Sequence, residues 1–400
     1  MNQLTDKTKI KRMRFLFMVT YMISYLTRIN YGAVILEMGH DTGISSSLLS
    51  LAVTGSFITY GAGQLFSGWF GDRIQPKKLV FTGLAVTTVM NLLIPVCHNF
   101  WQMTAVWCVN GLAQAFMWPP IVKLMVALFS EEEYKKASVV VSWGSSFGTI
   151  FVYLMSPFWI AVAGWRCVFI VSAILGAVMV LIWGHFCPDI AEEAKSEKKQ
   201  TGGLQLLKSP LILSIMFAIV LQGSLRDGVT TWMPSYVAET FHLGNNVSIL
   251  TGVLLPVFSI LCFQAASVIY RKRPNDPLLC AGGIFLAGAF FAFVLLLFSG
   301  RNAALCVLFM ALLTGCMHGV NLILICMIPA FFKESGNVST VSGILNSCTY
   351  VGSAISTYGI AKISESAGWN VTISVWILIA AAGTVVCFGC IPAWRHRFGK

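Results

Sequence analysis

The chain has 400 residues, of which 56% are hydrophobic and only 11% are charged, and its formal net charge is +11. A soluble domain has about 25% charged residues, so this composition excludes an ordinary soluble protein. Many apolar stretches reach the length of about 20 residues that a helix needs to cross a bilayer. We therefore expect an all-α, multi-pass membrane protein, and the polar, basic start of the chain predicts no cleavable signal peptide.

The apolar stretches predict twelve transmembrane helices. In chain order they are expected over 14–36, 46–70, 78–97, 101–129, 136–161, 165–186, 210–238, 247–270, 277–298, 302–332, 336–362 and 370–393. A polar stretch over 188–209 is predicted to be a cytoplasmic linker. It divides the chain into two six-helix halves, an N-terminal one over 1–187 and a C-terminal one over 210–400.

The positive charge is distributed unevenly along the chain. With the N-terminus placed inside, most of the 27 Lys and Arg residues fall on the cytoplasmic side, and only Arg166, Arg301 and Lys362 fall outside. This asymmetry is the positive-inside rule, so the basic balance indicates topology rather than a nucleic-acid partner. We expect a plasma (inner) membrane protein with both termini in the cytoplasm.

The 12 cysteines are scattered through apolar segments. Cys387 and Cys390 have the spacing of a metal or redox pair, but they lie inside the last predicted helix with no second pair nearby. Buried, inert thiols are the better interpretation. We expect no metal and no cofactor, and without a nucleophile–base cluster we expect no enzyme.

The two halves resemble repeats of one another. Ala163-Gly164-Trp165-Arg166 recurs as Ala367-Gly368-Trp369-Asn370, and Asn110-Gly111 corresponds to Thr314-Gly315 at the same offset. Two parallel six-helix repeats around a central linker are typical of the major facilitator fold, in which the substrate site lies between the halves near the midplane.

The loop after the second predicted helix strengthens this prediction. Gly68-Trp69-Phe70-Gly71-Asp72-Arg73, followed by Lys77 and Lys78, resembles the loop motif of the major facilitator superfamily. Gly68 permits close helix approach, and Asp72 can serve a helix end or pair with a basic group. The motif carries no information on the substrate.

Two arginines are predicted near the middle of the membrane. Arg28 lies in the first predicted helix, and Arg226 holds the matching place in the seventh. An arginine at a helix centre costs about 2.5–3.5 kcal/mol on insertion scales. We expect the two to face one central cavity and to hold a phosphate or carboxylate through bidentate hydrogen bonds. The alternative is a structural pair of Arg28 with Asp227, and Asp227 is also a candidate proton carrier.

Aromatic and polar residues share faces with the first arginine. Tyr21, Tyr25 and Arg28 follow helical spacing, and Tyr60 and Gln64 repeat it on the second helix. Together they can line a polar, aromatic-walled pocket, although an aromatic stripe in a membrane helix is more often packing. His318 is a candidate for proton transfer or for a structural hydrogen bond, and Lys123 can reach the interface.

The predicted fourth helix carries a more specific resemblance. Its run from Trp107 to Pro120, WCVNGLAQAFMWPP, is similar to that of the organophosphate:phosphate antiporters, as are Tyr25 with Arg28 and Arg226 with Trp232-Met233-Pro234-Ser235-Tyr236. The resemblance covers essentially the whole chain. It implies alternating access, with an arginine from each half binding a phosphate. The residues that it assigns to the site are Arg28, Arg226, Tyr21, Tyr25, Tyr60 and Tyr350.

Three positions depart from the glycerol-3-phosphate members of that family. Ile29 and Gln64 stand where those members have lysines, and the site histidine falls near Ser145. We expect a monomer that exchanges an organophosphate for inorganic phosphate. A proton-coupled transporter of an organic anion or sugar acid is the alternative, and a membrane sensor of sugar phosphates is the alternative of another class.

Overall fold

The computed structural model describes residues 4–190, 209–242 and 245–398 and is all-helical there. Its residues form two compact units. The first contains residues 1–200 with 332–344, and the second contains 201–331 with 345–400. Most of the predicted linker over 188–209 lies outside the described residues.

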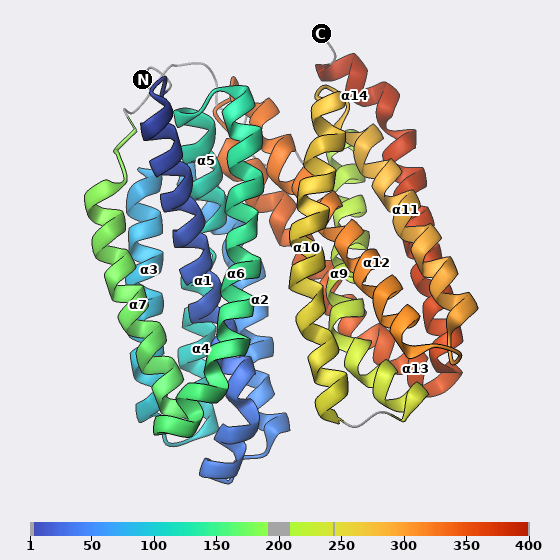
Figure 1. Cartoon of the computed structure of the whole chain (residues 1–400). Helices are drawn as coiled ribbons and strands as arrows, with labels where there is room; N and C mark the ends of the chain where they lie inside the picture. The colour runs from blue at the N-terminus through green and yellow to red at the C-terminus, as the bar shows by residue number, and fades with distance from the viewer. Residues whose placement is uncertain (1–3, 191–208, 243–244, 399–400) are drawn as a thin grey trace. The chain divides into compact units, whose positions relative to one another are not determined.

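The first unit is built from seven long or medium helices (Figure 1). Its helix α1 packs against α6 and α7, α2 packs against α4, and α3 packs against α7. The bounds are α1 (Lys7–Thr42), α2 (Ser46–Gly71), α3 (Pro76–Leu93), a 3-10 turn η1 (Ile94–Val96), α4 (Phe100–Gln114), α5 (Trp118–Leu128), α6 (Glu131–Ala163) and α7 (Trp165–Phe186).

The second unit repeats this construction. Its helix α12 packs against α9, α10 and α11. The bounds are α9 (Pro210–Phe241), α10 (Asn245–Lys272), α11 (Pro277–Phe298), α12 (Ala303–Asn321), a π-helix η2 (Leu322–Met327), a 3-10 helix η3 (Ile328–Phe332), α13 (Val338–Gly389) and α14 (Ile391–Phe398). The start of α13 belongs to the first unit, and the rest belongs to the second.

Local sequence sets where many helices begin. The Asn99 side chain accepts a hydrogen bond from Gln102 N at 2.9 Å, and Asn302 does the same for Leu305 N at 3.1 Å. Such caps satisfy backbone donors that have no partner within the helix. Pro76 and Pro277 open α3 and α11, where the missing N–H is not needed.

Each of the twelve predicted spans corresponds to a described helical segment, with three corrections. The helix predicted over 101–129 is divided into α4 and α5, because Pro119 and Pro120 follow the break. The helix predicted over 302–332 changes from α to π and then to 3-10 geometry. Most of the last two predicted spans belongs to α13, which is interrupted at Gly368 with φ 79°, and the end of the last span reaches into α14.

Nine stretches of the described helices are long and apolar enough to cross a membrane. They do not include α1, α2 or the part of α13 before Ser366. These three segments carry many of the polar side chains buried within the units, among them Arg28, Gln64 and Asn346. Large apolar side chains such as Leu181, Leu378 and Val385 are more than two-thirds exposed, as expected where helices face lipid.

The repeat seen in the sequence extends to backbone geometry and contacts. Gly164 has φ 74° and ψ 175°, and Gly368 has φ 79° and ψ 174°. The next residue after each glycine is a tryptophan whose indole N–H binds a carboxylate near the end of the unit's first helix. Trp165 donates to Asp41 at 3.0 Å, and Trp369 donates to Glu239 at 2.8 Å.

Candidate functional site

The first predicted arginine lies among aromatic rings. Arg28 is 8% exposed on α1, and its guanidinium carbon lies 4.1 Å from the ring centroid of Tyr25 and 4.7 Å from that of Tyr60 on α2. The ring of Tyr21 lies 5.1 Å from that of Tyr25 and 4.9 Å from that of Trp118. The structure therefore brings Arg28, Tyr21, Tyr25 and Tyr60 together, and cation–π attraction favours the buried charge.

Two other predicted residues of this unit hydrogen-bond to backbone carbonyls. Gln64 is fully buried on α2 and donates from Nε2 to the carbonyl of Ala115 at 3.3 Å, at the break between α4 and α5. Ser145 on α6 donates its hydroxyl to the carbonyl of Ser142 at 2.7 Å, within its own helix.

A buried polar network, which sequence analysis missed, fixes the helix that carries Arg28. Gln114 on α4 donates to the hydroxyls of Thr27 at 2.9 Å and Thr87 at 2.8 Å, and it accepts from Ser24 at 2.7 Å. Asn30 donates to Asn91 at 2.7 Å and to Ser172 at 3.0 Å. Ser24, Thr27 and Asn30 surround Arg28 in sequence. The network therefore ties α1 to α3, α4 and α7 on both sides of the arginine.

A signal for part of this network was present in the sequence. Asn110 and Gln114 lie four residues apart within the run that resembles the antiporters, and polar residues recur through α1. Buried polar groups need hydrogen-bond partners, so these residues predict a network. The partners on α3 and α7 could not be assigned without the tertiary structure.

The second arginine is held by its chain neighbour. Arg226 on α9 makes a bidentate pair with Asp227, with Nε 2.6 Å from Oδ1 and Nη2 2.8 Å from Oδ2. The Ser353 hydroxyl on α13 donates to the same carboxylate. Adjacent helical residues point in different directions, yet the long side chain of Arg226 bends toward the carboxylate of Asp227. Asp227 therefore occupies the fork of Arg226 that a phosphate or carboxylate would use.

The remaining predicted residues of the second unit are His318 and Tyr350. His318 on α12 lies within electrostatic range of Arg226 and Asp227, and its ring centroid is 5.4 Å from that of Phe263. Gln222, one turn before Arg226, donates to the carbonyl of Met317 at 3.0 Å and so ties α9 to α12. Tyr350 is half-buried on α13, three residues before Ser353.

The loop motif holds the start of α13 within the first unit. The Asp72 carboxylate accepts the backbone N–H groups of Ser339 at 3.0 Å and Thr340 at 2.7 Å. A carboxylate at a helix N-terminus is stabilised by unsatisfied amides and by the helix dipole. Lys123 Nζ lies 3.9 Å from Asp72 and donates to the carbonyl of Gly71 at 2.8 Å, so the structure places this lysine at the loop.

The other members of the motif support this contact. A Cβ at Gly68 would lie 2.7 Å from the carbonyl oxygen of Ser339, so glycine permits the close approach. The Arg73 guanidinium lies 4.0 Å from the ring centroid of Trp69 and donates to its carbonyl at 3.0 Å. Burial raises the pKa of Asp72, while the hydrogen bond from Thr340 and the charge of Lys123 oppose that rise.

Within the described ranges, no group of three or more His, Cys, Asp or Glu side chains is arranged to hold a metal ion. The twelve cysteines, including Cys387 and Cys390, are free thiols.

An all-helical fold with membrane-length apolar helices and an arginine within each unit is typical of a secondary transporter. The family model described as "Major Facilitator Superfamily" matches residues 17–357. The chain belongs to the major facilitator superfamily.

Comparisons with individual proteins agree with this assignment. The chain is 20% identical to the "Probable hexose phosphate transport protein" of Chlamydia muridarum, over 94% of this chain and 89% of the relative. It is 24% identical to the membrane sensor protein UhpC of Salmonella typhimurium, over 94% of this chain and 90% of the relative. The solved structure of the proton:xylose symporter XylE covers 98% of this chain and 96% of its own, with a TM-score of 0.78 and 11% identity, which shows the fold alone.

Proposed function

We propose that this protein moves a small anionic metabolite across the plasma membrane by alternating access, with both termini in the cytoplasm, and that it acts as a monomer. The leading substrate is a sugar phosphate or glycerol phosphate, exchanged for inorganic phosphate. Arg28 and Arg226 are the proposed anion-binding groups. The observation that carries the proposal is the burial of Arg28 against the rings of Tyr25 and Tyr60.

The energetics of Arg28 support an anion as its ligand. A guanidinium at a helix centre costs about 2.5–3.5 kcal/mol on insertion scales. An aromatic contact contributes about 0.5–2 kcal/mol through the face of the guanidinium plane. The N–H donors at the edge of that plane fit a phosphate or carboxylate bidentately. The distant relative named for hexose phosphate transport supports a phosphate ester as that anion.

The pairing of Arg226 with Asp227 favours a second candidate, proton-coupled transport of an organic anion or sugar acid. An incoming anion must compete with Asp227 for the guanidinium fork, which the carboxylate holds at 2.6 and 2.8 Å. A proton on Asp227 would weaken that hold and would enter together with the anion. The residues Ile29, Gln64 and Ser145, none of them basic, also suit a singly charged substrate.

A membrane sensor of sugar phosphates is the candidate of another class, since one relative is named as a membrane sensor. A sensor would bind its ligand without moving it. Substrate binding without flux in sealed vesicles therefore separates this class from both transport candidates.

Counterflow in proteoliposomes tests the proposal. Vesicles preloaded with phosphate are offered labelled glycerol phosphate, hexose phosphates and sugar acids, using the wild type, Arg28→Ala and Arg226→Ala. Arg301→Ala is the matched control, because Arg301 is exposed at the turn before α12. We expect phosphate-dependent exchange that both site variants abolish and the control retains.

The other outcomes are equally informative. Flux that needs a proton gradient and ignores internal phosphate would select the second candidate and make Asp227→Asn the next variant. Flux at the wild-type level in both arginine variants would reject the anion site. Binding without flux in any arm would select the sensor.

A further inference from the structure

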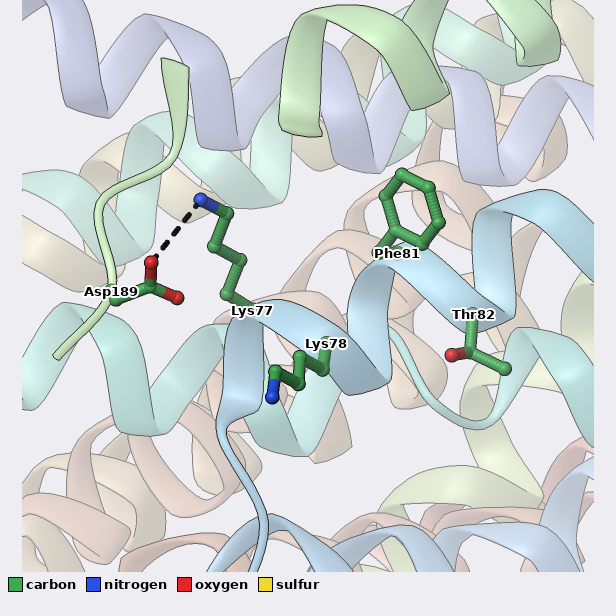
Figure 2. A pocket seen from close by; sticks show the side chains of 5 residues that line it. All are labelled: Lys77, Lys78, Phe81, Thr82 and Asp189. Atoms are coloured by element: carbon green, nitrogen blue, oxygen red, sulfur yellow. Dashed lines mark ion pairs between the residues drawn. The ribbon is translucent and has the colours of Figure 1, made fainter. Parts of the chain in front are cut away.

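A cavity of 410 Å³ lies at the first turn of α3. It is lined by Lys77, Lys78, Phe81, Thr82 and Asp189, all of them in the first unit (Figure 2). Lys77 is directed toward Asp189, which follows α7, while Lys78 extends from another side of the same helical turn. The proposed function uses none of these residues.

Two hydrogen bonds fix the walls of this cavity. The Trp183 indole on α7 donates to the carbonyl of Lys77 at 3.0 Å, and the Gln75 side chain donates to the carbonyl of Ile190 at 3.0 Å. A Cβ at Gly184 would lie 3.4 Å from the Phe81 ring, so α7 contacts that ring directly. The start of α3 and the end of α7 are therefore held together, and these contacts fix the backbone that forms the cavity.

The charges at the cavity favour an anion. Lys77 and Lys78 provide two ammonium groups, and Thr82 provides a hydroxyl donor. Asp189 offsets one charge only weakly, because it is 64% exposed and its carboxylate lies 3.6 Å from Lys77 Nζ. Ion pairs at the surface contribute about 0–1 kcal/mol. A phosphate group can therefore replace Asp189 as the partner of the Lys77 ammonium.

Apolar side chains continue from the cavity along both helices. On α3, Phe81 is 40% exposed, and Val89 and Leu92 are each 49% exposed. On α7, Phe186 at the same end of the unit is 63% exposed. Further along α7 the exposed side chains are Ile182, Leu181, Val178 and Ile174. A ligand with a charged head and long apolar tails matches the cavity and the apolar side chains that follow it. A free anion would contact only the charged residues of the cavity.

We propose that this cavity binds the phosphodiester headgroup of an anionic phospholipid, with its acyl chains lying along α3 and α7. The distribution of Lys and Arg predicts that this end of α3 is cytoplasmic, and the cytoplasmic leaflet carries anionic lipid. Lys77 and Lys78 contact the phosphate, and Phe81 lies at the junction of headgroup and chains.

The test compares lipid retention in the wild type and in Lys77→Gln/Lys78→Gln. The purified protein is mixed with phosphatidylglycerol or phosphatidylcholine of matched chains, and bound lipid is counted by native mass spectrometry. Because each lysine near an anionic surface contributes about fivefold to binding, we expect phosphatidylglycerol retention to fall on the order of 25-fold in the double variant. Phosphatidylcholine retention should remain unchanged.

Lys272→Gln/Arg273→Gln is the matched control, since it removes the same charge from an exposed position at the end of α10. It should retain phosphatidylglycerol as the wild type does. Lys77→Arg/Lys78→Arg should restore retention, because it keeps both charges. If the Gln pair does not fold, Lys78→Gln alone should show about a fivefold loss, because Lys78 is exposed.

Equal losses in the cavity variant and the α10 control would overturn the proposal, because general surface charge would then explain retention. Full displacement of phosphatidylglycerol by millimolar inorganic phosphate would also overturn it, and would assign the cavity to a free anion. Flux measurements play no part in this test, so its outcome is separate from that of the transport proposal.

Discussion

The two units share a scaffold but surround Arg28 and Arg226 with different partners. Gly164 and Gly368 turn the chain with the same dihedral angles, and each following tryptophan binds a carboxylate. Yet Arg28 lies against aromatic faces, which cannot neutralise its charge, whereas Arg226 is bound by the carboxylate of Asp227. The guanidinium of Arg28 is therefore stacked on rings, whereas that of Arg226 is bound by a neighbouring carboxylate.

The cores of the two units also differ. At the offset that relates Gly164 to Gly368, Gln114 corresponds to His318 and Ser172 corresponds to Trp376. At the offset that relates Arg28 to Arg226, Thr27 corresponds to Leu225. Some polar members of the buried network in the first unit thus have apolar counterparts in the second, such as Trp376 and Leu225, while others, such as His318, stay polar. A duplicated six-helix unit can keep its turns and its helix packing while some of its buried polar side chains are replaced by apolar ones.

The largest expected effect is at Arg28. Arg28→Lys keeps the charge but loses the planar fork and its stacking on Tyr25 and Tyr60. We expect initial exchange rates to fall about 100-fold, equivalent to about 2.7 kcal/mol of lost stabilisation. The measurement is counterflow with matched protein in each vesicle preparation. Arg301→Lys serves as the control and should leave the rate unchanged; a wild-type rate in Arg28→Lys would mean that charge alone suffices.

The polar core of the first unit should be the next most sensitive feature. Gln114→Leu removes the acceptor of the Ser24 hydroxyl and the hydrogen bonds that the hydroxyls of Thr27 and Thr87 accept, and a buried unsatisfied group costs about 1–3 kcal/mol. We expect the free energy of unfolding in detergent to fall by about 2 kcal/mol or more.

His318→Leu is the matched variant in the second unit, at the repeat-related position. It should change the unfolding free energy by less than Gln114→Leu, because Gln114 joins three side chains by hydrogen bonds, whereas His318 packs its ring against Phe263. Equal losses in the two variants would contradict the contrast between the two cores.

Asp227→Asn should sharpen the contrast between the arginines. The neutral amide of Asn binds the Arg226 guanidinium more weakly than a carboxylate does. The residue at position 227 therefore no longer competes with the incoming anion for that guanidinium. We expect anion affinity to rise by about tenfold, or about 1.4 kcal/mol, measured by titration calorimetry of the detergent-solubilised protein. Glu239→Gln, outside the buried pair, should leave affinity unchanged. Weaker binding in Asp227→Asn would show that the carboxylate supports the site instead of competing for it.

The smallest effects should be equal in the two units. Trp165→Phe removes the indole hydrogen bond to Asp41, and Trp369→Phe removes that to Glu239. A typical hydrogen bond contributes about 1 kcal/mol net, so each variant should lower the unfolding free energy by about that amount. Thermal unfolding followed by fluorescence measures both. Losses that differ severalfold between the two variants would contradict the equivalence of these turns.

Sequence analysis predicted the features that periodicity and repetition encode. The twelve helical spans follow from apolar stretches, and the sharing of a face by Tyr25 and Arg28 follows from helical spacing. The break between α4 and α5 was missed, although Pro119 and Pro120 were visible. A proline pair can kink a membrane helix or divide it, and the surrounding packing decides which.

Contacts between distant segments were beyond sequence analysis. The bond of Asn30 to Ser172 joins positions far apart in the chain, and no local pattern links them. For Asp72, the sequence predicted a helix end or a basic partner, and the structure provides both, at α13 and Lys123. The pairing of Arg226 with Asp227 depends on side-chain rotamers, which spacing along a helix does not determine.

The network around Gln114 and Asn30 also constrains the order in which the chain can be made. Helix α1 precedes α3, α4 and α7 in the chain, carries Arg28, and is not among the nine described stretches whose length and composition suit a membrane span. Its polar atoms find partners on α3 and α4 only after synthesis has passed Asn91 and Gln114, and on α7 only after it has passed Ser172. Stable residence of α1 in the bilayer therefore depends on helices made later, and shortening the nascent chain before α7 should leave the first helix exposed to quality control.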